Sequence, residues 1–373
     1  MTAAFRVGLA GGSHWGLAAK ACLEQMGPLP PGANLGFLYV TPGLGDCLSS
    51  LLTYLRETTG IVCWTGAVGQ DVFGPGGGIA EGPGLAIMAG DVDGDALRPF
   101  DGFATPAQFA AEHGPWLARH TPVAAVVHGD PRTADLAGQV PALADAAGAV
   151  LLGGLAATTA TPTRVCGRLA TQPLSGLLLG RQVPLATGLA QGCSPIGPIH
   201  QVTRSVERVV MDLDGGPALD VLKSDAGEII ARDLKRAAGY IHAAQPIPGA
   251  DGAWDYAVVP LSGIDRRRGW IEIGGAVAEG DPLMFVHHQP DIARRNVVRM
   301  LSDLADRLAG RPVRGGLYIA GAQRGGVAAD GVAGDLSLIE EALGSFPLIG
   351  FSSEGEIHRD RLHGYAGMLA LFL

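Results

Sequence analysis

The chain has 373 residues, of which 47% are hydrophobic and only 17% are charged, so a large buried core is expected. Its formal net charge of −9 argues against a general nucleic-acid or anionic-membrane binder, because such proteins are usually basic. No apolar run approaches the roughly 20 residues that span a bilayer, and the first residues lack the pattern of a secretory signal.

The predicted elements alternate between helices and strands along the chain. Ser13 is placed to cap a helix that runs to about residue 25. The clearest later helix begins near Asp291 and stops before Gly310. Residues 228–244 are also expected to be helical. Strands are expected over the apolar runs 35–40, 61–64, 85–89, 123–128, 150–156, 174–179, 206–213, 256–261, 270–273 and 316–320.

One pattern, strand–helix–strand–strand, occurs near both ends of the chain. Residues 35–89 contain it first and residues 316–373 contain it again, each time with a glycine-rich corner before the last strand. A fainter third copy lies over residues 123–156. Such self-similarity indicates related structural units. We therefore expect an α/β fold of two related halves, residues 1–210 and 211–373, with mixed β-sheets flanked by helices in α-β-β-α layers.

The corner of the last copy is the first candidate site. Two carboxylates separated by one glycine are able to bind an ammonium, a guanidinium or a metal, or to act as acid and base. The alternative is a solvated turn, the usual place for carboxylates. The candidates here are Ser352, Ser353, Glu354 and Glu356, with Thr65 and Gly66 at the corresponding corner of the first copy.

The loop over residues 191–198, QGCSPIGP, is the second candidate. It contributes Gln191, Gly192, Cys193 and Ser194. A thiol in a rigid Gly/Pro loop is suited to be a ligand or a nucleophile, although no histidine adjoins it in the sequence. The alternative is a structural loop with a buried thiol. The five cysteines form no CxxC pair, which favours free thiols in a reducing cytoplasm.

Two further positions follow apolar runs. His287 and His288 end one such run, where one imidazole could face a pocket and ligate a metal or haem; the alternative is a strand-end pair without that role. Gln323 and Arg324 follow another, and a guanidinium at the carboxyl end of a strand is well placed to hold a carboxylate. The glycine-rich run 74–78 lacks the lysine of a phosphate-binding loop and predicts a hairpin. No metal site is predicted.

Several of these stretches resemble one family. The run QGCSPIGP followed by VTRSVERVVMDLDGGPALDVL resembles the join between the two parts of FIST proteins. The stretches GLYIAGAQRGG and PLIGFSSEGEI resemble the carboxyl-terminal signature of that family, and IVCWTGAVG resembles the amino-terminal one. The resemblance implies a cytoplasmic sensory domain that binds a small molecule, for which amino acids or their derivatives are the proposed class.

Some members of the family that the chain resembles bind haem, sense nitric oxide and act on histidine kinases, so the resemblance implies haem as a possible cofactor. No F-box, kinase or methyl-accepting segment is recognised in this chain, so we expect output through a separate partner such as a histidine kinase, without membrane insertion or nucleic-acid binding. From the residues we expect Arg324 to hold a ligand carboxylate and Glu354 or Glu356 to hold an amine. The alternatives are a haem sensor that uses His287 or His288, an enzyme that uses Cys193 or Glu354/Glu356, and a scaffold without ligand; a binding protein is favoured over an enzyme.

Overall fold

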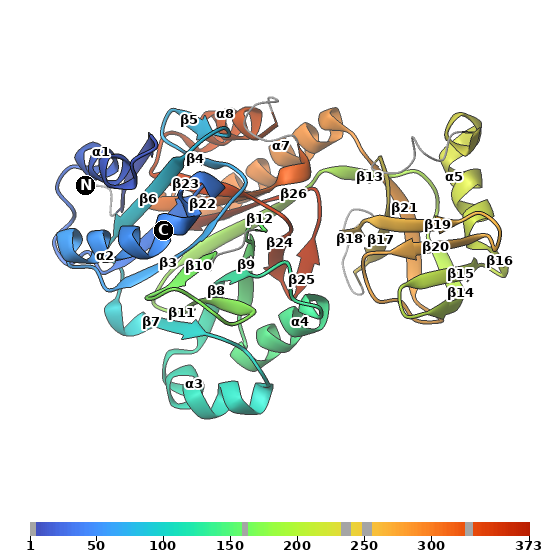
Figure 1. Cartoon of the computed structure of the whole chain (residues 1–373), viewed down its shortest axis with the longest axis horizontal. Coiled ribbons are helices and arrows are strands. Elements are labelled where there is room, and N and C mark those ends of the chain that lie inside the picture. The colour runs from blue at the N-terminus through green and yellow to red at the C-terminus, as the bar shows by residue number, and fades with distance from the viewer. Residues whose placement is uncertain (1–4, 159–162, 233–239, 248–255, 325–330) are drawn as a thin grey trace. The chain divides into compact units, whose positions relative to one another are not determined.

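The computed structural model describes residues 5–158, 163–232, 240–247, 256–324 and 331–373 (Figure 1). Two compact units are formed. The larger unit consists of Met1–Ala190, Val297–Leu362 and Ala366–Leu373, and the smaller unit consists of Gln191–Asn296 and His363–Tyr365. The division at residue 210 stays a prediction, whereas the α/β class with mixed sheets is confirmed.

The larger unit contains the expected repeat three times. In each copy the first two strands are parallel and joined by a helix, as a parallel pair requires, and the last strand is antiparallel to the first. The fainter copy is therefore as complete as the others. The first copy is β2 (Leu35–Val40), α2 (Leu48–Thr59), β3 (Cys63–Val68) and β6 (Gly84–Gly90); the second is β8 (Pro122–Gly129), α4 (Leu136–Ala147), β9 (Val150–Leu155) and β11 (Leu174–Gly180); the third is β22 (Gly315–Gly321), α8 (Gly331–Leu343), β23 (Leu348–Ser353) and β26 (Ala366–Phe372).

The three copies are interlocked in a cycle. The chain that follows the second strand of each copy adds strands to the sheet of another copy: β4 (Val72–Gly74) and β5 (Gly77–Ile79) extend the third sheet beyond β23. Likewise β24 (Glu356–Arg359) and β25 (Arg361–His363) extend the second sheet beyond β9, and β10 (Arg164–Cys166) extends the first beyond β3. Each sheet is thus completed by a segment from a different copy.

A glycine at the same place in every copy permits the parallel pairing. A Cβ at Gly66, Gly153 or Gly350 would lie only 1.8, 1.8 or 1.7 Å from a carbonyl oxygen of the partner strand. No other residue fits so close a backbone approach. The glycine-rich corners of the sequence therefore reflect packing within each sheet.

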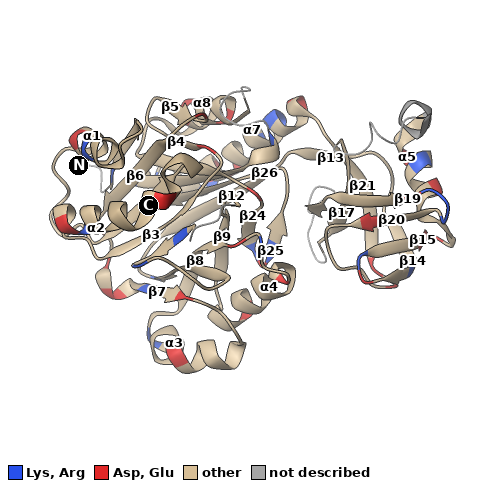
Figure 2. Cartoon of the chain, in the orientation of Figure 1, with Lys and Arg blue, Asp and Glu red and all other residues tan. Residues whose placement is uncertain are grey.

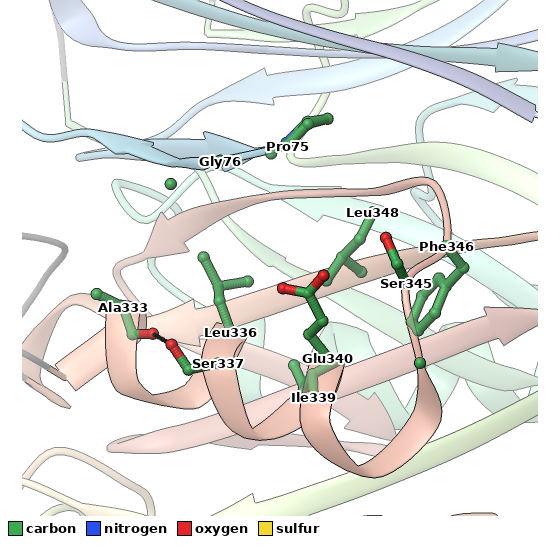
Figure 3. Close-up of a pocket in the computed structure, with 13 residues that line it drawn as sticks. Pro75, Gly76, Ala333, Leu336, Ser337, Ile339, Glu340, Ser345, Phe346 and Leu348 are labelled. Carbon is green, nitrogen blue, oxygen red and sulfur yellow. Dashed lines mark hydrogen bonds between the residues drawn. The ribbon is translucent and has the colours of Figure 1, made fainter.

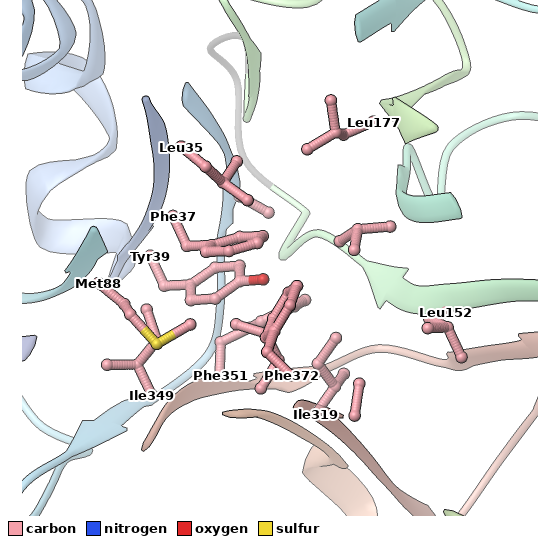
Figure 4. Packing of buried hydrophobic residues seen from close by; sticks show 14 of the residues in the cluster. Leu35, Phe37, Tyr39, Met88, Leu152, Leu177, Ile319, Ile349, Phe351 and Phe372 are labelled. Atoms are coloured by element: carbon pink, nitrogen blue, oxygen red, sulfur yellow. The ribbon is translucent and has the colours of Figure 1, made fainter. Parts of the chain in front are cut away.

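The inner core of the larger unit is shared by all three copies. Figure 4 shows Phe37, Tyr39, Phe351 and Phe372 together near its centre. The rings of Tyr39 and Phe351 are stacked with their centroids 4.6 Å apart. Because each fully buried side chain of this size contributes about 1.5–3 kcal/mol, this core favours association of the copies.

The remaining elements of the larger unit complete the edges and outer faces. Figure 2 shows acidic residues on several of its helices, in keeping with the net charge of −9. In the part of the chain that the structure describes, no helix combines the length and apolar character required to cross a bilayer. The remaining elements are β1 (Phe5–Gly11), α1 (Trp15–Met26), η1 (Pro42–Cys47), η2 (Gly94–Ala96), β7 (Leu97–Asp101), α3 (Pro106–His120), β12 (Leu185–Gln191), α7 (Pro290–Leu308) and η3 (Ala322–Arg324). The last residue of β12 and residues 290–296 of α7 belong to the smaller unit.

The smaller unit is built on an antiparallel sheet in the order β18-β17-β21-β14-β15-β20-β19. A short strand pairs with β21 and another with β15. Its elements are β13 (Cys193–Pro195), β14 (His200–Val206), β15 (Val209–Leu213), β16 (Gly216–Pro217), α5 (Ala218–Arg232), β17 (Ile241–Pro246), β18 (Tyr256–Val259), β19 (Leu261–Asp265), β20 (Trp270–Ile273) and β21 (Pro282–His288).

The expected helix over residues 228–244 is wrong at its carboxyl end. Helix α5 ends at Arg232, residues 233–239 lie outside the described residues, and Ile241–Pro246 is a strand between β18 and β21. The alanine-rich sequence favours a helix locally, but tertiary pairing overrides so weak a preference.

Candidate functional site

The candidate residues from the sequence fall into two groups, one in each unit. The smaller unit contains Gln191, Gly192, Cys193, Ser194, His287 and His288. The larger unit contains Thr65, Gly66, Gln323, Arg324, Ser352, Ser353, Glu354 and Glu356. Strand pairing and ring packing bring the first group together, whereas ion pairs and hydrogen bonds connect most of the second.

In the smaller unit, strand pairing brings the Gln191–Ser194 loop onto the two histidines. Strand β13 pairs with β21 so that Cys193 lies opposite His288 and Ser194 opposite His287. The Nδ1–H of His288 donates to the Gly192 carbonyl at 2.9 Å. The Ser194 hydroxyl lies 3.3 Å from Nε2 of His287. The Gln191–Ser194 loop and the strand end are therefore one local structure, although nearly a hundred residues separate them in sequence.

A third histidine, which the sequence did not single out, completes this group. His242 on β17 is only 2% exposed, and neither of its ring nitrogens has a hydrogen-bond partner among the described residues. Its ring packs 4.4 Å from that of Tyr365, which also packs against His288 at 5.3 Å. Burial, and to a lesser extent His288, lowers the pKa of His242 to about 4, so the imidazole is neutral at pH 7.

Gln191 is buried in the same group. Its amide nitrogen donates to the Tyr256 carbonyl at 2.7 Å and lies 3.4 Å from Nδ1 of His363. Its backbone carbonyl accepts from Asn296 at 2.8 Å. Its side-chain oxygen is buried and has no hydrogen-bond partner in the part of the chain that the structure describes. We call Gln191, His242, His288, His363 and Tyr365 the histidine cluster.

Cys193 belongs to a small apolar core beside the histidine cluster. Its side chain is fully buried among residues that include Tyr256, Met284 and Val286. Its carbonyl accepts the Tyr256 hydroxyl at 2.6 Å. This burial matches the structural alternative for the Gln191–Ser194 loop, because a nucleophilic thiol must be accessible to its substrate. All five cysteines are free thiols, as expected.

In the larger unit, Arg324 lies at the carboxyl end of β22 and is buried. One of its terminal nitrogens is 3.0 Å from the Asp335 carboxylate on α8, and the other donates to the Ala190 carbonyl at 3.4 Å. The Tyr318 hydroxyl donates to the same Asp335 oxygen at 2.5 Å. Burial acts to lower the pKa of Arg324, but Tyr318, Asp335 and Glu356 outweigh it and raise the pKa. That Arg324 binds a ligand carboxylate stays a prediction.

Glu356 joins this network from β24 and is fully buried. One carboxyl oxygen accepts the Ala366 amide at 2.9 Å, and the other has no hydrogen-bond partner. Burial raises the pKa of Glu356 to about 8, although the Ala366 amide and Arg324 act in the opposite direction. The group is therefore mostly protonated at pH 7. We call Tyr318, Arg324, Asp335 and Glu356 the carboxylate network.

Four other candidates form hydrogen bonds at this corner, and three of them, Glu354, Ser353 and Ser352, join different copies. Glu354 accepts from the Gln70 amide at 3.0 Å and from the backbone and hydroxyl of Thr158, both at 2.8 Å, so it ties the corners of all three copies. The Ser353 hydroxyl accepts the backbone N–H of Leu155 at 3.0 Å. Ser352 donates to the Asp71 carboxylate at 3.1 Å, and Gln323 donates to the Glu354 carbonyl at 3.5 Å.

Thr65 lies in the inner core beside another buried histidine. Its hydroxyl is 3.4 Å from Nδ1 of His128, and the Tyr39 hydroxyl is 3.3 Å from Nε2. Burial, with a smaller contribution from Arg164, lowers the pKa of His128 to about 3. This neutral histidine links strands of two copies. Gly66 lies where the backbones of β2 and β3 approach too closely for a side chain.

The sequence did not point to His242, Tyr365 or Asp335. Each occurs in an ordinary stretch of strand, turn or helix, and only burial beside a candidate residue distinguishes it. A histidine within an alanine-rich run was the one available signal, at His242. Among the described residues, no group of three or more His, Cys, Asp or Glu side chains is arranged to hold a metal ion.

Comparison with known proteins gives consistent matches. A model of the FIST N domain matches residues 34–216 and a model of the FIST C domain matches residues 212–359. The chain is 32% identical over 217 residues to uncharacterized protein MT0656 and to uncharacterized protein Rv0628c of Mycobacterium tuberculosis, covering 54% of this chain and 55% of each relative. It is 31% identical over 218 residues to uncharacterized protein Mb0898c of Mycobacterium bovis, covering 54% of each chain. The chain thus spans about half the length of the curated relatives it matches.

Proposed function

The chain belongs to the FIST family, whose domains act in sensory signal transduction, and from that premise we propose that it binds an amino acid or a derivative in the histidine cluster. The signal would pass to a separate partner such as a histidine kinase. The observation that carries this proposal is the set of unpaired polar atoms at His242 and Gln191. A buried polar atom without a partner costs about 1–3 kcal/mol, and a ligand is one way to recover that cost.

The chemistry of these atoms fits a zwitterion. A neutral imidazole offers one donor and one acceptor, and the Gln191 oxygen offers an acceptor. An amino acid brings an acceptor in its carboxylate and donors in its ammonium group, with no net charge to bury. The rings of Tyr365 and His288 would supply the apolar wall that small-ligand sites usually have.

A haem sensor is the second candidate within the same cluster. The bond from Nδ1–H of His288 to the Gly192 carbonyl is of the kind that orients a metal-ligating histidine, so His288 would be the axial ligand. A porphyrin also needs a wide slot against that imidazole. Tyr365 packs on His288 and His242, and this close packing favours the smaller ligand.

An enzyme is less well supported. Cys193 is fully buried in an apolar core, and Glu354 already accepts three hydrogen bonds. A catalytic nucleophile or base must reach its substrate. Glu356 has a pKa suited to proton transfer, but its carboxyl group is also fully buried.

The test is ligand binding by wild type and by His242→Phe. Native mass spectrometry of freshly purified protein would identify a retained ligand, and a thermal-shift panel of amino acids would find one that exchanges. We expect at least one amino acid to raise the melting temperature of wild type and of the control His120→Phe, a buried histidine of the larger unit, but not of His242→Phe. An equal response of His242→Phe, or no response of wild type to any amino acid, would overturn the proposal. A Soret band would replace it by the haem alternative.

A further inference from the structure

The surface of the larger unit has a hollow of about 500 Å³ that none of the candidate residues lines. Its walls are the β4–β5 hairpin on one side and helix α8 on the other, with the loop after α8 closing one end (Figure 3). The hairpin belongs to the first copy of the repeat and the helix to the third. Its volume lies within the range of about 300–1,000 Å³ that is usual for small-molecule sites.

The lining of the hollow combines apolar and polar groups. Leu336, Ile339, Phe346 and Leu348 supply its larger apolar side chains, and among the described residues Glu340 is the only charged one that lines it. Figure 3 shows the Glu340 carboxylate extending from α8 toward the hairpin, beside Ser345. Among the described residues, none forms an ion pair with Glu340. The site therefore offers a ligand apolar contacts and one negative charge.

The backbone keeps the hollow open. Gly76 and Gly77 form the hairpin turn with φ of 80° and 137°, a conformation that favours glycine. A Cβ at either position would meet no atom within 4 Å, so the turn leaves space where other residues would place side chains. On the helix side, the Ser337 hydroxyl donates to the Ala333 carbonyl at 3.0 Å. Its oxygen can still accept a hydrogen bond, so Ser337, Glu340 and Ser345 supply the polar side-chain groups available to a ligand.

We propose that this hollow binds a small organic ammonium ion with an apolar body. The ammonium would contact Glu340 and the apolar part would pack on Leu336, Phe346 and Leu348. A zwitterionic amino acid fits poorly, because no cation lines the hollow to accept its carboxylate. The site is thus independent of the histidine cluster in both ligand class and location in the fold. Since it joins the hairpin of one copy to the helix of another, its ligand would also stabilise the interlocked sheets.

The probe is phenethylammonium, compared with its neutral analogue 2-phenylethanol in a titration followed by protein NMR. We expect saturable binding of phenethylammonium, with weaker binding of the alcohol. Glu340→Gln should weaken binding of the ammonium about fivefold, the upper limit for one solvent-exposed ion pair. Glu341→Gln removes the neighbouring exposed carboxylate, which does not line the hollow, and should leave binding unchanged.

A second variant tests the location without relying on charge. Ala333→Trp places a large ring in the hollow and should abolish binding of both probes while the protein stays folded by circular dichroism. Absence of saturable binding to wild type would overturn the proposal. Equal effects of Glu340→Gln and Glu341→Gln would do the same, because the ammonium would then be attracted by general surface charge. Unchanged binding by Ala333→Trp would place the ligand elsewhere.

Discussion

Replacing Glu356 with glutamine should stabilise the larger unit at neutral pH. Glu356 is fully buried, and its pKa is about 8 in the folded chain against an ordinary value of 4.5. Between these values the folded state keeps a proton that the unfolded state releases, so stability falls as pH rises through this window. Relative to low pH, where Glu356 is protonated in both states, thermodynamic linkage lowers the free energy of unfolding by under about 1 kcal/mol at pH 5, about 3 kcal/mol at pH 7 and about 4 kcal/mol at pH 8.

Glutamine mimics the protonated acid. Its oxygen keeps the acceptor for the Ala366 amide, and it never ionises. The difference in unfolding free energy between Glu356→Gln and wild type should therefore grow with pH by these amounts. Urea denaturation at several pH values, followed by hydrogen exchange in β22 and β26, measures that difference within the larger unit. Other titrating groups cancel because they are shared by both proteins.

The exposed carboxylate of Glu341 provides the matched control. Glu341→Gln should run parallel to wild type at every pH, because Glu341 is exposed and its carboxylate is solvated by water in both the folded and the unfolded chain. A constant difference between Glu356→Gln and wild type from pH 5 to 8 would refute the reasoning. It would mean that Glu356 is ionised in the folded protein and compensated by Arg324.

Three further changes test other parts of the structure. Arg324→Met should cost about 3–5 kcal/mol by leaving the buried Asp335 carboxylate without its cation and with only the Tyr318 hydroxyl, and adding Asp335→Leu should recover most of that loss in urea denaturation; equal loss in the double variant would contradict a simple ion pair. Glu354→Ala removes three hydrogen bonds between copies of the repeat and should cost about 1–3 kcal/mol, with Glu354→Gln costing less; a neutral alanine variant would show that the corner is not held by this carboxylate. His200 lies between Asp214 and Asp225, which outweigh the effect of burial and raise its pKa, so stability from the protonated form is present below its ordinary value of 6.5 and is lost as pH rises through the folded pKa. His200→Asn should remove that loss from hydrogen exchange in β14, and an unchanged pH profile would argue against it.

Local pattern was enough to predict the repeat, because helix and strand periodicity are properties of neighbouring residues. The three copies follow from it, and the glycine-rich run at residues 74–78 was likewise enough to predict a hairpin there. The exchange of hairpins between sheets did not follow, because β4 and β24 pair with strands that are remote in sequence. The strand at residues 241–246 was missed for the same reason: its partners, and not its alanines, decide its conformation.

The binding role of the candidate residues stays a prediction. The Gln191–Ser194 loop and His288, which the sequence analysis treated as separate candidates, meet across a strand pair. His242 and Asp335 escaped notice because the chemistry of a histidine or an aspartate depends on burial, which a single sequence does not state. The glycine-rich corners were the most conspicuous motifs, but they did not distinguish a binding site from a packing requirement. Their glycines are needed because two strands approach each other closely there.

The corners show why conspicuous sequence and ligand chemistry need not coincide. At Gly66, Gly153 and Gly350 the absence of a side chain is required by a carbonyl oxygen less than 2 Å from the Cβ position. Glu354 is likewise committed to hydrogen bonds between copies. Groups whose hydrogen bonds are all used by the fold have little left to offer a ligand, whereas buried groups with unused capacity carry a cost that binding can remove. By that criterion His242 and Gln191, like the second carboxyl oxygen of Glu356, rank above Glu354 and the corner glycines as places to look for the sensed molecule.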